Sequence, residues 1–229
     1  MRSRLPSWEA QLWSYLSSGD GMHCPLANTC DNSTDSERCT DINQGNLTRL
    51  IAADGEWLTD AQRGPRPCRR GVMPLIERLA EEQLRKGGVQ GLPVPNSLLS
   101  LADENRSIEV RRVNLKACCA ATWLVRDGWV IQLSDNGSPS HSRMCLFHEA
   151  FHILAHSRSK AQPVFSRRGI VQGHFNELMA DYFAMCILMP REWVRAKWAE
   201  GGDASTLSEV FGVPGSAMWL RLHEFDLVD

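Results

Sequence analysis

Apolar residues recur at helical spacing in several stretches of the chain. The first stretch starts at Pro74 and places apolar side chains on one helical face: Leu75, Ile76, Leu79, Ala80 and Leu84. Proline suits the first position of a helix, and Gly87-Gly88 is typical of a helix end. The pattern therefore predicts a helix that begins at Pro74 and ends before Gly87.

Two longer helices are predicted further along, over residues 144–156 (MCLFHEAFHILAH) and 175–189 (FNELMADYFAMCILM). The second should end at Met189, because Pro190 cannot continue a helix. The tail, residues 206–228, predicts two short amphipathic helices that Gly-Val-Pro divides, in outline a helix-turn-helix.

Strands are predicted between the first helix and the second. Residues 108–113 (IEVRRV) are rich in β-branched side chains, and residues 121–133 hold Asp127-Gly128 between two apolar runs. Asp-Gly between apolar runs is a strong signal for a hairpin turn. We therefore expect a small antiparallel sheet before the helix over 144–156, and an α+β fold.

The chain divides into three zones. Residues 1–70 are polar and rich in turn formers, and they end in a Pro- and Arg-rich stretch, residues 63–70, typical of a linker or extended arm. Residues 71–200 hold the predicted sheet and long helices, and residues 201–229 the C-terminal helical pair. We predict an N-terminal segment of unknown role, a core domain and a pair of helices packed on that core.

Composition and charge narrow the class of protein. The 229 residues are 43% hydrophobic, enough for one sizeable core and a small accessory module, and the formal net charge is −2. This balance gives no electrostatic reason to expect nucleic acid as the main partner. The first residues lack the apolar segment of a signal peptide, and no run is long enough to span a membrane. We expect a soluble, cytoplasmic protein without a membrane partner.

Eight cysteines in a cytosolic chain favour thiols or metal ligands over disulfides. Four stand in the N-terminal segment: Cys24, Cys30, Cys39 and Cys68. Their spacing lacks the CxxC pairs of well-defined metal sites, so a structural zinc ion or iron–sulfur cluster, free thiols and a redox switch all stay open. The other four have apolar neighbours in the sequence and are expected in the core. They are Cys118, Cys119, Cys145 and Cys186.

The helix over 144–156 carries the strongest chemical signal, His148-Glu149-x-x-His152. Residues four apart project to the same side of a helix, so two imidazoles can bind one Zn²⁺ there. Glu149, on the flank of that stripe, can accept a proton from a zinc-bound water. The alternative is a buried helix whose histidines form local hydrogen bonds.

A catalytic zinc site needs a third protein ligand and an open position for water. Glu177, on the predicted helix 175–189, is the candidate for that ligand. Asp181, one turn on, can accept a hydrogen bond from the far nitrogen of a ligating histidine. Because this helix is otherwise apolar, two carboxylates on it need a partner. His156 and His174 are the competing ligands; His156 can instead line the cleft or cap its helix, and His174 can stabilise an oxyanion.

The C-terminal helical pair is predicted to pack rather than to read DNA. Its second helix, residues 215–225, has one arginine against one glutamate, which makes direct DNA binding unlikely. We expect Trp219 and Leu222 to contribute to the core.

Taken together, HEAFHILAH and NELMADYFAMCILMP resemble the ImmA/IrrE family of metallopeptidases over residues 72–225. That family's second motif, E-x-x-A-[N/D]-x-F-A-x-x-L-L-M-P, is filled from Glu177 to Pro190. Phe151, where glycine is common, and Ile187, in place of leucine, depart from the pattern. The resemblance implies a gluzincin-like zinc endopeptidase, with a zincin-like core in which the HExxH helix and a second helix supply the Zn²⁺ ligands.

The resemblance also implies the partner, a transcriptional repressor of the helix-turn-helix class, cleaved in a bacterial stress or mobile-element circuit. The predicted hairpin strand before the HExxH helix can hold an extended peptide by edge pairing. A sensor or binding protein that grips a repressor without cutting it is the alternative function. The intact Glu149 argues against that alternative.

Overall fold

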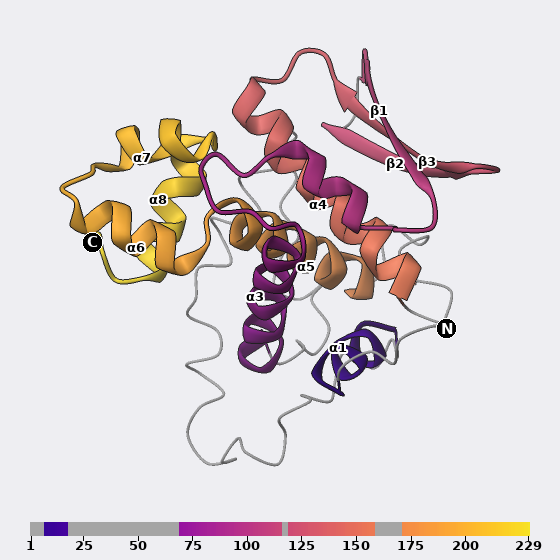
Figure 1. The fold of residues 1–229 in the computed structure, drawn as a ribbon, viewed down its shortest axis with the longest axis horizontal. Coiled ribbons are helices and arrows are strands. Elements are labelled where there is room, and N and C mark those ends of the chain that lie inside the picture. Colours follow the sequence, from indigo (N-terminus) through magenta and orange to yellow (C-terminus); the bar gives the residue numbers. More distant parts are fainter. Residues whose placement is uncertain (1–6, 18–68, 116–118, 159–170) are drawn as a thin grey trace.

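The structure, a computed structural model, describes residues 7–17, 69–115, 119–158 and 171–229 (Figure 1). Its elements, in chain order, are α1 (Ser7–Ser17), α3 (Arg69–Lys86), η4 (Asn96–Leu101, a 3₁₀ helix), β1 (Ser107–Val113), β2 (Ala120–Val125), β3 (Gly128–Ser134), α4 (Pro139–Arg158), α5 (Val171–Leu188), α6 (Arg191–Ala199), α7 (Ala204–Phe211) and α8 (Gly215–Glu224). The α+β prediction is confirmed. The four cysteines of the N-terminal segment lie outside the described residues.

The sheet is mixed, so the prediction of an antiparallel sheet was wrong in part. Its order is β1-β3-β2: β3 pairs antiparallel with β2 and parallel with β1. The hairpin prediction fixed only the pairing of β2 with β3. β1 lies next to β3 and not next to β2, so the connection from β1 to β2 passes the position of β3. No local sequence pattern encodes that crossover.

The hairpin turn lies one residue earlier than Asp127-Gly128. Val125 pairs with Gly128, so Arg126 and Asp127 form the turn. Gly128 opens β3 beside β1, where a Cβ atom would lie 2.5 Å from the carbonyl oxygen of Ser107. Glycine is therefore required here by the close approach of two strands rather than by the turn.

α3, α4 and α5 all begin earlier than predicted, α5 at Val171 rather than at residue 175. α3 starts at Arg69 and holds Pro74 inside it, because the apolar stripe extends upstream: Val72, Ile76 and Leu79 are all fully buried. α4 starts at Pro139, the position in a helix's first turn that proline tolerates. α5 ends at Leu188, before Pro190, as predicted to within a residue.

α4 is the central element of the fold (Figure 1). It contacts β2 and β3 on one side and α5 on the other, and α5 in turn packs against α3. Apolar side chains therefore line α4 nearly all round, and most of the helix from Ser142 to Ala155 is buried. Polar side chains inside such a helix need specific partners, since burial without one is unfavourable. No helix among the described residues is long and apolar enough to cross a membrane.

α1 belongs to the same core, although no sequence pattern predicted it. Leu12, Trp13 and Leu16 are buried, and the Trp13 ring lies 6.0 Å from the ring of Phe151 on α4. The Trp13 indole N–H donates to Glu9 at 3.2 Å. α1 is thus part of the folded core.

A buried arginine, Arg221, joins the C-terminal helix α8 to α3. Arg221 of α8 donates to Glu77 of α3 at 2.8 Å, to Glu224 at 2.7 Å and to the Met189 carbonyl at 3.1 Å. Arg191 of α6 donates to the same Glu77 at 2.8 Å. These charged groups connect α3, α6 and α8.

α7 and α8 occupy the stretch where two short helices were predicted, and they are divided at Gly212-Val213-Pro214. Gly212 caps α7 with a φ of 65°, a left-handed conformation that favours glycine. Leu222 is fully buried as expected, whereas Trp219 is 39% exposed, which corrects its assignment to the core. On α8, Trp219 instead lies beside His223, with ring centroids 5.3 Å apart.

Candidate metal centre

Two imidazoles project from the middle of α4 toward one point. The Nε2 atoms of His148 and His152 lie 3.0 Å apart, as expected for residues four apart on a helix. His148 is buried, and the His152 side chain keeps 15% of its surface exposed. The pair therefore lies at the edge of the core rather than inside it.

Glu177 reaches the same point from α5. Its Oε2 atom lies 3.2 Å from Nε2 of His148, and its Oε1 atom lies 3.5 Å from Nε2 of His152. The three ligand atoms all lie within 4.8 Å of one another, and the Glu177 side chain is 48% exposed. Two nitrogens and one oxygen, open to solvent on the carboxylate side, form a donor set that fits a divalent metal ion with a vacant coordination position.

Asp181 holds His148 from behind. One turn after Glu177 on α5, its Oδ1 atom lies 2.5 Å from Nδ1 of His148 and accepts the hydrogen bond of that nitrogen. This directs Nε2 toward His152 and Glu177, and loss of the Nε2 proton would give the tautomer that a metal ligand needs. Burial would lower the pKa of His148, but the hydrogen bonds to Asp181 and Glu177 outweigh it and raise that pKa well above its usual value.

Glu149 is buried next to the imidazole pair. It is not one of the three residues whose ligand atoms converge. Burial raises the pKa of Glu149, and the nearby His148 only partly offsets that effect. A carboxylate whose pKa is raised toward neutrality is better matched to accepting and returning a proton. The environment of Glu149 thus suits a general base.

Of the two competing histidines, the structure describes the side chain of His156 but not that of His174. His156, a further turn along α4, lies outside the group of convergent ligand atoms, and its ring packs edge-on against Trp129 with centroids 4.9 Å apart. Burial lowers its pKa. His174 falls within α5, but its side chain lies outside the described residues.

A second cluster was missed by sequence reasoning. Cys119, His141 and Cys145 also bring three ligand atoms within 4.8 Å of one another. Cys119 and Cys145 were expected to be plain core residues, and His141 was not considered. The four-residue spacing of His141 and Cys145 on α4 was the available signal, but the contribution of Cys119 depends on where β2 meets α4.

An α+β fold with two histidines and a glutamate converging from two helices defines a candidate metal-binding protein. Residues 105–223, more than half of the chain, match the model of the IrrE N-terminal-like domain, a family of peptidases. The chain belongs to this family. The match confirms the resemblance to the ImmA/IrrE proteins, and the family implies a metallopeptidase.

The chain also has a distant likeness to a solved structure. Among solved structures, a Mycobacterium tuberculosis transcriptional regulator is similar at 18% identity with a TM-score of 0.47, over 64% of this chain and 46% of that one. The chain thus corresponds to less than half of that protein's length. No curated protein matches this sequence.

Proposed function

We propose that this protein is a zinc-dependent endopeptidase that cleaves a helix-turn-helix transcriptional repressor in a bacterial regulatory circuit. The convergence of His148, His152 and Glu177, with Asp181 behind His148, is the observation that carries the proposal. Two imidazoles and one carboxylate form the ligand set of many zinc hydrolases. Membership in a peptidase family supports the same reaction class.

The roles of the residues follow from their positions. When bound, a zinc ion supplies a Lewis acid that polarises the scissile carbonyl and lowers the pKa of a water molecule. Glu149 accepts the proton of the attacking water and then delivers it to the leaving nitrogen. Asp181 keeps the His148 ring in one orientation, so that Nε2 faces His152 and Glu177 and would serve as a ligand once it loses its proton.

The edge of β2 is the proposed binding surface for the substrate chain. In the sheet order β1-β3-β2, β2 pairs with β3 on one side only, within the described residues. It also contacts α4, the helix that carries the histidines. Trp123, Leu124 and Val125 on this strand are exposed. An extended peptide added to such an edge gains main-chain hydrogen bonds and contacts to these apolar side chains.

The substrate class is tested by cleavage. The purified full chain is loaded with Zn²⁺ and incubated with the helix-turn-helix regulator encoded nearest to its gene, and fragments are identified by mass spectrometry. We expect discrete fragments that disappear when a chelator removes the metal.

Glu149→Gln is the matched control for that assay. It preserves the shape of the side chain and leaves all three ligands intact, so the variant should bind one equivalent of Zn²⁺ at this site and fail to cleave. A Glu149→Gln variant that cleaves as fast as the natural chain would contradict the mechanism. Wild-type protein that binds the regulator tightly without cutting it would favour the non-cleaving alternative.

A further inference from the structure

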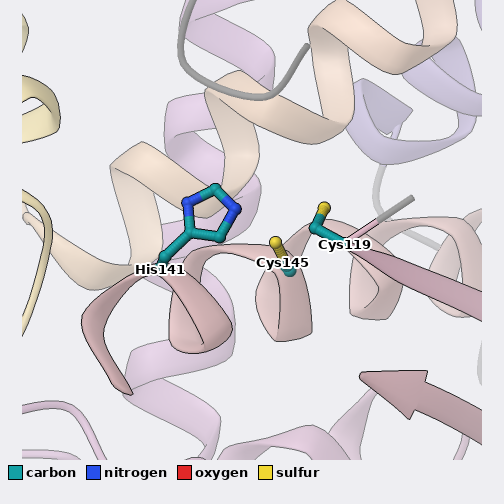
Figure 2. A group of neighbouring side chains, drawn as sticks. All are labelled: Cys119, His141 and Cys145. Carbon is teal, nitrogen blue, oxygen red and sulfur yellow. The ribbon is translucent and has the colours of Figure 1, made fainter. Parts of the chain in front are cut away.

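Cys119, His141 and Cys145 form a compact group beside the N-terminal turns of α4, before the turns that carry the histidine pair (Figure 2). His141 and Cys145 lie one turn apart on α4, and Cys119 immediately precedes β2. Figure 2 shows both sulfur atoms on the same side of α4 as the imidazole ring. Cys145 is buried, whereas Cys119 and His141 are half-buried, so solvent can reach the group.

One of the three groups, Cys119, is already in its metal-binding form, whereas the interaction with Cys119 and burial raise the pKa of Cys145. Neither sulfur is in a disulfide. The hydrogen bond with Cys145 and the nearby His141 lower the pKa of Cys119 to about 4, so its sulfur is a thiolate at neutral pH. The same interaction with Cys119 raises the pKa of His141. The thiolate is the form of cysteine that binds metals.

We propose that Cys119, His141 and Cys145 constitute a second metal site, which binds one thiophilic divalent ion of the zinc class through two thiolates and one imidazole. Sulfur donors select zinc-like ions over magnesium or calcium, and three protein ligands leave a fourth position for water or another donor. On binding, the Cys145 thiol and a protonated His141 release their protons to solvent.

This site is separate from the centre proposed above. The two groups share no residue, and the first contains only nitrogen and oxygen ligands. Cys145 precedes His148 by three residues, or about 4.5 Å along the helix axis. An ion held by Cys119 and Cys145 would join α4 to the start of β2, the strand whose edge is the proposed peptide-binding surface.

Cobalt(II) tests the proposal, because thiolate ligands give Co²⁺ an intense near-ultraviolet charge-transfer band and nitrogen and oxygen ligands do not. The test uses the full chain in which the cysteines that are not proposed ligands, apart from Cys186, are replaced by serine: Cys24, Cys30, Cys39, Cys68 and Cys118. Titration with Co²⁺ alone, under a non-thiol reductant, should produce the band and saturate at one equivalent of thiolate-bound metal.

Matched variants in the same background assign the band. Cys119→Ser or Cys145→Ser should abolish it, and Cys186→Ser, which removes a buried thiol on α5, should preserve it. Glu177→Ala should also preserve it while lowering total bound metal by one equivalent, so failure of the first centre is distinguishable from failure of the second. A folded background protein without the band, or a band that survives Cys119→Ser, would overturn the proposal.

A second measurement covers the case in which the multiple replacement does not fold. The natural chain is treated with iodoacetamide with and without Zn²⁺, and modification of Cys119 is followed by peptide mass spectrometry. We expect Zn²⁺ to suppress alkylation of Cys119 in both the natural chain and Glu177→Ala. Equal modification with and without Zn²⁺, or oxidative linkage of Cys119 to Cys145 in the presence of Zn²⁺, would show a reactive thiol pair instead of a metal site.

Discussion

In the proposed metal centre, Asp181 orients the ligand His148 and does not itself bind the metal. Asp181→Asn keeps the size of the side chain but replaces the charge that accepts the His148 hydrogen bond. Loss of such a partner typically lowers metal affinity by about 10- to 100-fold. We expect that decrease for Zn²⁺, measured by competition with a chromophoric chelator, while the fold persists.

Asp203→Asn is the matched control, because Asp203 is an exposed carboxylate that caps α7 far along the chain from the centre. Asparagine is an equally good capping residue, so neither stability nor metal affinity should change appreciably. Equal Zn²⁺ affinity in Asp181→Asn and the natural chain would show that Asp181 does not orient a ligand.

At the scale of single residues, the sequence predicted that His148, His152 and Glu177 lie together. The spacing of His148 and His152 fixes their common direction on any helix, and two carboxylates on an otherwise apolar helix imply a partner. What no spacing encodes is the contact between elements. The orientation of Asp181 toward Nδ1, and the approach of Cys119 to His141, depend on how α5 and β2 pack against α4.

At the scale of elements, α8 carries a buried charged residue. Arg221 is fully buried and joins α8 to Glu77 of α3. Arg221→Met fills a similar volume but leaves Glu77 with Arg191 alone, and loss of a buried ionic partner costs about 3 kcal/mol. We expect the free energy of unfolding in urea to fall by about that amount. Arg126→Met, at the exposed hairpin turn, should change it by less than about 0.5 kcal/mol.

The same ion pairs predict how stability depends on acid. Burial would raise the pKa of Glu77, but Arg191 and Arg221 outweigh it and hold that pKa below its ordinary value of 4.5. A carboxylate with a lowered folded-state pKa stabilises the fold above its ordinary pKa, and this contribution is lost as the pH falls through the lowered value.

We therefore expect the stability of the natural chain to decline below pH 4.5, and Glu77→Gln to show a shallower decline. Unfolding in urea, followed by circular dichroism at pH values on both sides of 4.5, measures the two slopes. Identical slopes would mean that Glu77 is not stabilised as a carboxylate by the two arginines.

The elements themselves were largely predictable, and their boundaries were not. Apolar periodicity located the central turns of α3, α4 and α5, since each of these helices buries at least one face. The predicted start of α3 is too late, because proline commonly opens a helix but Pro74 lies inside this one, and the buried Val72 continues the apolar stripe before it. The strand order was unpredictable for a different reason, because it depends on a long-range crossover.

In the molecule as a whole, α1 and the family core form one hydrophobic unit. The segment that matches the family begins at residue 105, yet α1 and α3 precede it and pack into the same core. Leu12 is fully buried. Leu12→Ala should lower the free energy of unfolding by about 2–5 kcal/mol, the usual cost of truncating a buried leucine.

Leu124→Ala provides the comparison, since Leu124 is 46% exposed on β2 and its truncation leaves no cavity. Its effect on the unfolding free energy should stay below about 1 kcal/mol. Equal effects of the two substitutions would mean that α1 is not part of the folded core. The domain boundary predicted at residue 70 would then describe the molecule better than a single core that includes α1.

The central claim is that one metal ion lies between α4 and α5. A crystal of the zinc-loaded full chain, with anomalous diffraction recorded on both sides of the zinc absorption edge, tests it most directly. The account predicts an anomalous peak about 2.0–2.2 Å from Nε2 of His148, Nε2 of His152 and a carboxylate oxygen of Glu177. A zinc-loaded crystal without a peak between these three residues, or with Glu177 turned away from it, would contradict the account.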